Sequence, residues 1–378
     1  MAAATVETAA AWRARARRFA ETELAPHAAE IDRTDAFPSS LVPGLGREGF
    51  FGVGIPPAWG GQGGDSRTTV AVLEELSRGC AAVAVELAVH LSVCAQPIVS
   101  AGSDEQRRRY LPALARGELL GAFALSEAGS GSDAGALRAR YARTDDGFEI
   151  SGTKMFISNA ASAGLVLLFA TRDPGLGKAG ISAFLVPARS PGISVPQRLE
   201  KLGLHGSETM ELALDHVRLP ASALLGREGD GLRIALQALS GGRVGIASCA
   251  LGVARAAFEE MLRNVRQDAA EWKRHALARA YAELEAAAAV VADAAARKDA
   301  GGEFVVPASV AKLLASRAAV SIASAGVDVA AEAGAASGAA AERLLRDARV
   351  FPIVEGTSEI QELVIARALL EPTAETTL

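Results

Sequence analysis

Cysteine is scarce in this sequence, and so are aromatic side chains. Among its 378 residues there are 3 cysteines, Cys80, Cys94 and Cys249, which lie far apart. Their spacing fits neither a disulfide framework nor a metal-ligand pattern, so we predict no metal site and expect the reducing environment of the cytoplasm. The net charge of −5 gives no reason to expect a nucleic acid or an anionic membrane as a partner.

The stretch near the N-terminus is not expected to be a signal peptide. A signal peptide needs an uninterrupted apolar core, and arginines interrupt the alanine-rich stretch near the N-terminus. These are Arg13, Arg15, Arg17 and Arg18. No run of about twenty apolar residues stands out that could span a membrane. We therefore expect no membrane insertion.

What is abundant favours a mainly helical protein. Hydrophobic residues make up 50% of the chain but aromatic residues only 5%, which indicates alanine-rich helices. Changes of periodicity predict an N-terminal helical domain over 1–118, a middle β domain over 119–224 and a C-terminal helical bundle over 225–378. Within the bundle, we expect long helices at 230–267, 271–298 and 307–333.

Near the C-terminus, a carboxylate stands beside a glycine just before an amphipathic helix. The segment is Val354-Glu355-Gly356-Thr357-Ser358-Glu359-Ile360-Gln361. Glycine lets a ligand approach the backbone closely, and the amides at the start of a helix point outward as unused donors. The position suits a general base. Taken alone, however, such a glutamate is more often a solvated loop residue.

Four other segments change that interpretation. They are Phe123-Ala124-Leu125-Ser126-Glu127-Ala128-Gly129-Ser130-Gly131-Ser132-Asp133, Gly152-Thr153-Lys154-Met155-Phe156-Ile157-Ser158-Asn159, Leu202-Gly203-Leu204-His205-Gly206-Ser207 and Gly241-Gly242-Arg243-Val244-Gly245-Ile246-Ala247. Together with the Glu355 segment, and in this order, they closely resemble the acyl-CoA dehydrogenase family. The resemblance implies an N-terminal helical domain, a middle β-barrel or sandwich and a C-terminal helical bundle, assembled as a homodimer or homotetramer.

The resemblance also implies a reaction, the α,β-dehydrogenation of an acyl thioester. In the family, the glutamate before Gly-Thr removes the α-proton, which makes Glu355 the expected base. The backbone amide of that glutamate and a ribityl hydroxyl of FAD hold the thioester oxygen, and a hydride passes from the β-carbon to FAD. The expected substrate is an acyl-CoA or an acyl-carrier-protein thioester. The expected oxidant is an electron-transfer flavoprotein or another acceptor of flavin electrons.

Site residues follow from the resemblance position by position. Phe156 stands where a tryptophan commonly stacks on the flavin ring, and Ser158 where a threonine lies near its reactive edge. On the sequence pattern alone, Phe156 would be a core residue of an alternating strand. The implied cofactor-binding residues are Phe123, Leu125, Ser126, Gly131, Ser132, Phe156, Ser158, Arg266, Thr357 and Glu359. The implied substrate-binding residues are Ser132, Ser240, Arg243 and Gly356.

Departures from the family pattern concern the adenine end of the cofactor. Arg266 is kept, but the Phe-Gly-Lys that usually follows is absent, and the Gly-Gly-Asn-Gly stretch falls on Ala331–Gly334. Asp268 and Glu332 place negative charge where a pyrophosphate would lie, which would weaken FAD binding. In addition, Ser240 replaces an aspartate that binds the pantetheine arm in many relatives.

Three functions are compatible with this pattern. The first is the flavin-dependent dehydrogenase. The alternative is an enzyme of the same fold with weak or lost FAD that performs a non-oxidative proton transfer or elimination on an acyl thioester with Glu355. The third, a scaffold without activity, is disfavoured because the Glu355 loop is kept. The acyl group and its carrier stay open.

Overall fold

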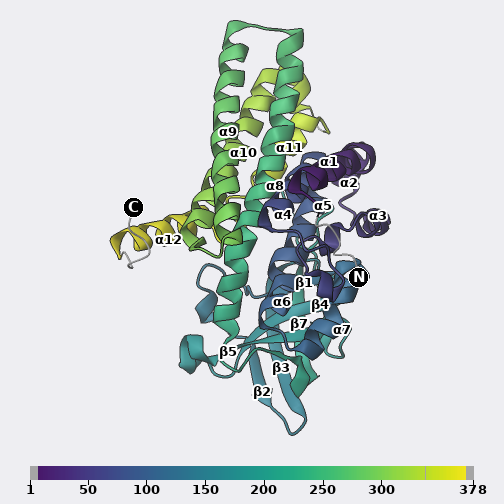
Figure 1. Cartoon of the computed structure of the whole chain (residues 1–378), viewed down its shortest axis with the longest axis vertical. Coiled ribbons are helices and arrows are strands. Elements are labelled where there is room, and N and C mark those ends of the chain that lie inside the picture. Colours follow the sequence, from purple (N-terminus) through teal and green to yellow (C-terminus); the bar gives the residue numbers. More distant parts are fainter. Residues whose placement is uncertain (1–6, 337, 372–378) are drawn as a thin grey trace.

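The computed structural model describes residues 7–336 and 338–371. Figure 1 shows N-terminal helices on one side, a β-sheet at the bottom and a bundle of long helices rising to the top. The N-terminal helices are α1 (Ala9–Phe19), α2 (Ala28–Thr34), α3 (Val42–Arg47), α4 (Ser66–Gly79), α5 (Ala81–Ala88), α6 (Gln96–Ala101) and α7 (Asp104–Ala115). Two π-helical segments, η1 (Ala20–Leu24) and η6 (Val89–Ala95), continue α1 and α5.

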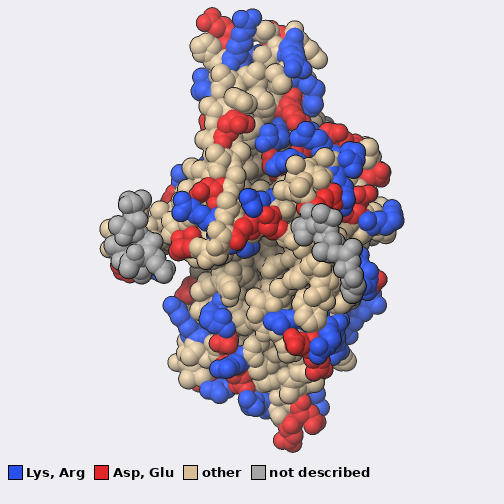
Figure 2. All heavy atoms as spheres, viewed as in Figure 1, with Lys and Arg blue, Asp and Glu red and all other residues tan. Residues whose placement is uncertain are grey.

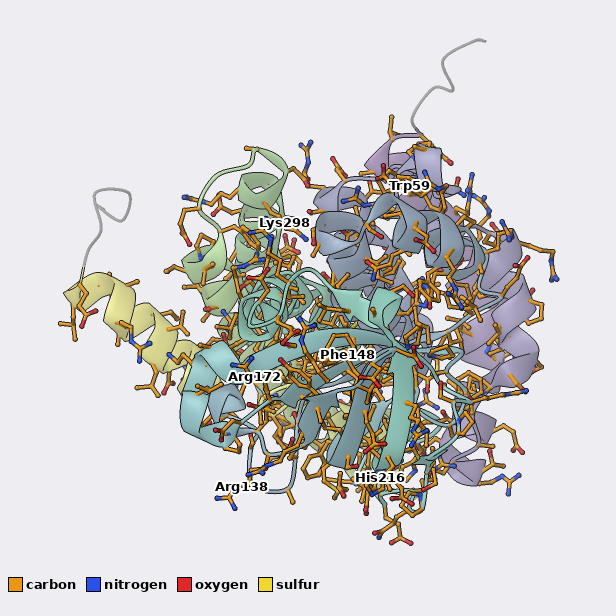
Figure 3. All side chains as sticks on the ribbon, turned by 90° about the horizontal axis from the view of Figure 1, so that it is seen from below. Trp59, Arg138, Phe148, Arg172, His216 and Lys298 are labelled. Carbon is orange, nitrogen blue, oxygen red and sulfur yellow. The ribbon has the colours of Figure 1, made fainter. Side chains whose placement is uncertain are left out.

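The middle part is one open, mixed sheet of eight strands. They are β1 (Gly121–Ala124), β2 (Arg140–Arg143), β3 (Gly147–Ser158), β4 (Leu165–Thr171), β5 (Ile181–Pro187), β6 (Ile193–Ser194), β7 (Thr209–Pro220) and β8 (Leu224–Leu225). Their order is β6-β7-β3-β2-β4-β5-β8, and β1 pairs in parallel with β4. Phe148 lies within the sheet region, whereas Arg138 and His216 lie at its periphery (Figure 3). The predicted β domain is thereby confirmed.

Strand β4 explains how the sheet is attached to the helices. All seven of its residues are buried, so it reads as a continuous apolar run in the sequence. Leu167 and Phe169 belong to a core shared with α6, α7 and the start of α8. Val166 and Leu168 point to the opposite face, into the core that the strands form among themselves. The sheet is therefore anchored to the helical part by one of its two faces.

The C-terminal part is the predicted helical bundle. Its helices are α8 (Gly231–Gln267), α9 (Glu271–Asp299), α10 (Val305–Ala335), α11 (Ala340–Ala348) and α12 (Ser358–Leu370). The three long helices expected from the sequence are confirmed to within about two residues at each end. In Figure 1, α12 projects sideways from the body of the molecule.

The arginines that interrupt the N-terminal stretch have a structural use. Arg13 contacts Glu74 over 2.7 Å and Glu75 over 3.0 Å, and Arg17 contacts Glu75 over 2.9 Å. Both carboxylates are buried in α4, and Arg255 of α8 also reaches Glu74 over 2.7 Å. Buried charges need such partners, because an unpaired carboxylate in the interior is strongly destabilising. The pairs join α1, α4 and α8.

The expectation that no stretch is long and apolar enough to span a membrane is wrong. Three helical stretches are long and apolar enough, by length and composition, to cross a membrane: Ala81–Ala101, Gly231–Gln267 and Val305–Ala331. In the first two, 83% of the most apolar window is buried inside the protein, and in the third 56%. A helix that is packed on all sides is apolar all round, and α8 shows this packing: an added Cβ at Gly252 would lie 2.5 Å from Ser77 Cβ of α4.

The surface mixes charges of both signs. On the face shown in Figure 2, lysine and arginine side chains are interspersed with acidic ones over the bundle, the N-terminal helices and the sheet. No large area of a single sign stands out among the described residues of that face. The three cysteines are free and buried.

Candidate active site

The Glu355 segment is a tight turn between α11 and α12. Two successive residues have left-handed backbone angles, Glu355 with φ of 55° and Gly356 with φ of 90°. A residue with a side chain adopts this conformation only at a cost, on the order of 1–2 kcal/mol. Thr357 follows as the N-cap of α12, where its hydroxyl accepts a hydrogen bond from the Ile360 amide. The surrounding structure must hold this turn in place.

Two buried side chains hold the turn by one carbonyl oxygen. Lys312 Nζ of α10 donates to the Gly356 oxygen over 2.8 Å, and Gln361 Nε2 of α12 donates to the same oxygen over 2.9 Å. Gln361 also contacts the Glu355 carbonyl oxygen, over 3.4 Å. Earlier in the loop, Ser316 of α10 donates to the Phe351 oxygen over 3.2 Å. The loop backbone is thus fixed from two helices at once.

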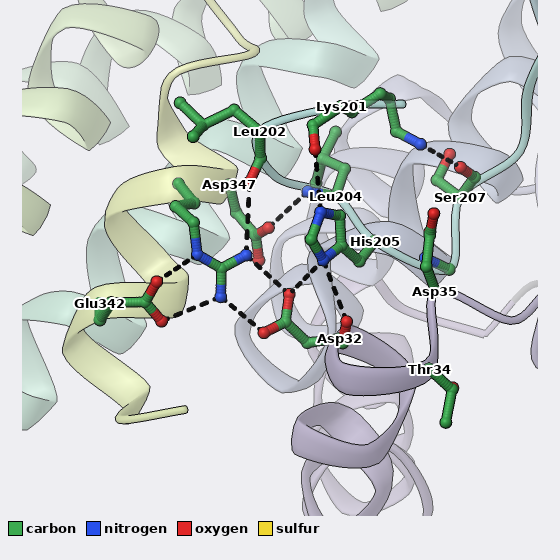
Figure 4. Close-up of polar contacts among 12 residues, drawn as sticks. Asp32, Thr34, Asp35, Lys201, Leu202, Leu204, His205, Ser207, Glu342 and Asp347 are labelled. Carbon is green, nitrogen blue, oxygen red and sulfur yellow. Dashed lines mark hydrogen bonds and ion pairs between the residues drawn. The ribbon is translucent and has the colours of Figure 1, made fainter. Parts of the chain in front are cut away.

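The helix before the loop is tied to the other two parts of the protein. Arg346 of α11 contacts Asp32 of α2 through both nitrogens, at 2.8 and 2.5 Å, and Asp347 accepts from the Leu204 amide over 2.6 Å (Figure 4). His205, in the same segment as Leu204, lies with its two ring nitrogens near the Asp32 and Lys201 oxygens. The Leu202–Ser207 segment singled out in the sequence therefore anchors α11, which leads into the Glu355 turn.

The Glu355 carboxylate lies over α8 at a place where that helix has no side chain. An added Cβ at Gly242 would lie 2.8 Å from Glu355 Cδ, closer still to Oε2, and 3.0 Å from Val93 Cγ1 of η6. Oε2 is inaccessible to solvent and has no hydrogen-bond partner among the described residues. Burial raises the pKa of Glu355 to about 7, and nearby Arg243 and Lys312 oppose that rise.

Arg243 is the second charged group of this site. It is 6% exposed on α8, and its Nη1 donates to Ser309 Oγ of α10 over 3.1 Å. Its Nε is buried without a partner among the described residues. Burial lowers the pKa of Arg243, and Glu355 raises it. Arg243 is thus a buried cation with a free donor.

One wall of the site is apolar. Val89 and Val93 of η6, Ala238 of α8 and the partly buried Phe123 of β1 form one small cluster. Phe123 is held edge-on against Phe169 of β4, with ring centroids 5.0 Å apart. A π-helical segment at this point matches the tendency of such segments to occur at functional sites.

The segment after β1 and the end of β3 form a second surface. The Met155 amide donates to the Ser126 oxygen over 2.9 Å, which joins the two segments. A register shift between Lys154 and Ile157 bulges β3, and Phe156 there has φ of 62° and is 63% exposed. The core position that strand alternation predicts for Phe156 is therefore wrong, because the bulge turns the ring outward.

Comparison with known proteins decides the family. Family models named acyl-CoA dehydrogenase N-terminal, middle and C-terminal domain match residues 6–118, 122–217 and 229–370. This chain belongs to the acyl-CoA dehydrogenase family. An acyl-CoA dehydrogenase of Bacillus subtilis (strain 168) is 42% identical over 368 residues, which cover 94% of this chain and 96% of that protein.

Solved structures agree with this result. Butyryl-CoA dehydrogenase from Megasphaera elsdenii matches with a TM-score of 0.94 and 33% identity, covering 98% of this chain and 100% of that one. A glutaryl-CoA dehydrogenase from Mycobacterium smegmatis in complex with FADH2 matches with a TM-score of 0.91 and 30% identity, covering 97% and 95%. This acyl-CoA dehydrogenase family member is thus a flavin oxidoreductase that dehydrogenates acyl thioesters.

The residues at the end of β3 and in the loop after β1 fit one part of a flavin site. The exposed Phe156 ring offers a flat apolar face, with Ser158 two residues further along β3. Added Cβ atoms at Gly129 and Gly131 would meet nothing within 4 Å, so this loop leaves its backbone open to a ligand. The loop is held by Lys154, whose Nζ donates to the Leu125 oxygen over 3.1 Å.

The residues that the resemblance places near the adenine end of the cofactor do not all lie near the Glu355 turn in this chain. Arg266 is exposed near the far end of α8, about 35 Å from Arg243 at 1.5 Å of rise per residue. Asp268 is exposed and contacts Lys273 over 2.8 Å, so its charge already has a partner. Ala331 has φ of 52°, which suits the glycine found there in relatives. The Glu332 side chain lies outside the described residues.

Sequence reasoning missed three residues of the site. Gly242, Lys312 and Gln361 lie around the Glu355 turn but were not among the predicted site residues. Lys312 had a recognisable signal, since a lone lysine interrupts an apolar helix there. Gly242 and Gln361 had none, because their contacts depend on how α8 and α12 pack. Of the predicted residues, Ser240 is 7% exposed and donates to the Leu236 oxygen of its own helix.

Proposed function

We propose that this enzyme oxidises a short acyl thioester with Glu355 as the base. The observation that carries this is the Glu355 carboxylate: Oε2 is buried without a partner, and its pKa is raised to about 7. A base with a pKa near the working pH is ionised often enough to act and still accepts a proton readily. The Gly242 position gives it room, and the two cations near it favour the ionised form.

The Glu355 turn also supplies a donor for the thioester oxygen. The Glu355 amide makes no hydrogen bond within the described part of the chain, so it is free to stabilise an enolate. Arg243, with its unpartnered Nε, is a second positive group near the reacting centre. Bound FAD, which Leu125, Ser126, Ser132, Phe156 and Ser158 would hold, supplies the acceptor for the β-hydride.

A short acyl group fits the apolar wall. Val93 Cγ1 would lie only 3.0 Å from an added Cβ at Gly242, so η6 and α8 approach closely beside the Glu355 carboxylate. A solved relative at 33% identity is a butyryl-CoA dehydrogenase. We infer coenzyme A as the carrier and, from the family resemblance, an electron-transfer flavoprotein as the oxidant.

The test is an anaerobic titration of the FAD-loaded protein with butyryl-CoA. The visible flavin absorbance should bleach in the unmodified protein. Glu355→Gln should keep the flavin but bleach more slowly, by roughly 10²–10⁴-fold, since an amide cannot accept the proton. Glu362→Gln, which removes a carboxylate paired with Arg317 on the surface of α12, the helix that follows the Glu355 turn, is the matched control and should bleach normally. Flavin that binds but never bleaches with any saturated thioester would refute the proposal.

We also propose that the enzyme is a homo-oligomer. Helix α12 exposes Leu363 (59%), Leu369 (55%) and Leu370 (83%), and Gln361 is its one buried residue among those described. An isolated helix of this length is marginal in water, so a second copy of the chain is the expected cover. The distant Arg266 would reach a cofactor only from another subunit. Sedimentation should give a dimer or tetramer; a monomer would contradict this.

A further inference from the structure

Lys312 is a charged side chain in a place where charge is unfavourable. It lies in α10 between the buried Ala311 and Leu313 and is itself 0% exposed. Burying an ammonium group is costly unless it is paired and hydrogen-bonded. Lys312 forms no ion pair with any residue that the structure describes, and its one hydrogen bond there goes to the Gly356 oxygen over 2.8 Å. Core packing alone does not explain a lysine at this position.

The groups around Lys312 all belong to the candidate active site. Burial is the largest effect on Lys312 and lowers its pKa to about 8, while Glu355 and Glu359 raise it and Arg243 lowers it further. The influence is mutual, because Lys312 and Arg243 both lower the pKa of Glu355 against the larger effect of burial. Burial raises the pKa of Cys249 on α8, and Glu355 raises it further. Two helices, α8 and α10, therefore contribute the cations that act on the base.

We propose that Lys312 is a positioning residue for the base: its ammonium group holds the Gly356 carbonyl next to Glu355, and its positive charge favours the ionised form of the Glu355 carboxylate. The proposal rests on Glu355 being the base of the proposed function. The carbonyl contact acts on geometry, because it restrains the left-handed turn that aims the carboxylate over Gly242. The charge acts on protonation, because a cation nearby favours the ionised form of a carboxylate.

Gln361 allows the two effects to be separated. It holds the same Gly356 oxygen, over 2.9 Å, but carries no charge. Removing Gln361 should loosen the turn without changing the electrostatics, whereas removing Lys312 should change both. Gln361 is equally buried, at 0% exposure, so Gln361→Met and Lys312→Met are comparable replacements in the interior.

The experiment measures the titration of the Glu355 carboxyl directly. Protein labelled with 13C at the glutamate side-chain carboxyl carbons is titrated by NMR, and the Glu355→Gln variant assigns the signal. Lys312→Met should move the midpoint upward by about one pH unit, the lower end of the roughly 1–3 units that a nearby opposite charge produces. Gln361→Met should leave the midpoint in place. If Lys312→Met does not fold, Lys312→Gln, which also removes the charge, provides the same test.

Kinetics then tests the geometric part. With butyryl-CoA, the acidic limb of the kcat/KM profile should move upward in Lys312→Met, while Gln361→Met should lower kcat without moving the limb. An unchanged NMR midpoint in Lys312→Met, or an equal shift in Gln361→Met, would overturn the proposal. Because the NMR titration needs no substrate, an inactive enzyme with the expected midpoints would count against the proposed function and not against the role of Lys312.

Discussion

Replacing Gly242 by alanine tests the placement of the base more sharply than replacing Glu355 itself. The new Cβ would lie 2.8 Å from Glu355 Cδ, whereas carbon atoms in ordinary contact are about 3.5–4.0 Å apart. Either the carboxylate or the loop must therefore move by about 1 Å. Val93 blocks one direction, because its Cγ1 would be 3.0 Å from the same Cβ.

A displacement of that size matters for proton transfer. A misplacement of about 1 Å can lower the rate by about 10²-fold, and each tenfold loss is about 1.4 kcal/mol in the barrier. Gly242→Ala should therefore lower kcat for butyryl-CoA by roughly 10²-fold. Helix propensity favours alanine over glycine by about 1 kcal/mol, which offsets part of the cost of this crowding.

Gly241→Ala is the matched control for this substitution. It is the preceding residue of α8, gains the same helix propensity, and its new Cβ would meet only the flexible end of Lys298, at 3.2 Å. Flavin absorbance of both variants should equal that of the unmodified protein, and Gly241→Ala should melt at the same or a higher temperature. In a Glu355→Gln background, Gly242→Ala should lower kcat little further, because the group that it displaces can no longer accept the proton. Equal kcat values for the two alanine variants would refute this account of the site.

Two further predictions concern stability and assembly. Asp347 is buried, and burial raises its pKa from 3.8 to about 6. Ionisation of Asp347 therefore opposes folding, and the free energy of unfolding falls as the pH rises from about 4 to 6. Asp347→Asn should therefore have the same free energy of unfolding in urea as the unmodified protein at pH 4, but a larger one at pH 8, by up to about 3 kcal/mol. An equal difference at both pH values would contradict this role of Asp347. Leu363→Glu on the exposed face of α12 should lower the sedimenting mass, and an unchanged mass would remove α12 from the interface.

Much of the fold follows from the sequence because its signals are local. The three long helices of the bundle were predicted from periodicity, and the middle β domain from a change of periodicity. The Glu355 turn was recognised because a carboxylate stands beside a glycine just before an amphipathic helix. The five ordered segments indicated the acyl-CoA dehydrogenase family, and the comparisons confirm this assignment.

Other features depend on distant residues and could not be read in this way. Composition does not distinguish a helix buried in a bundle from one that crosses a membrane, because both are apolar all round; Ala81–Ala101 is long and apolar enough to cross a membrane, yet most of it is buried inside the protein. Alternation predicted a core position for Phe156, but a bulge in β3 reverses the direction of the ring.

The role of Glu355 depends on both the sequence and the tertiary structure. The sequence alone determined which carboxylate stands in the turn. Only the tertiary structure decided that this carboxylate is a strong candidate base, because its raised pKa comes from burial between α8 and α10, and its room from a missing side chain at Gly242. Desolvation and close approach are properties of packed surfaces, so they arise only when segments far apart in the chain meet.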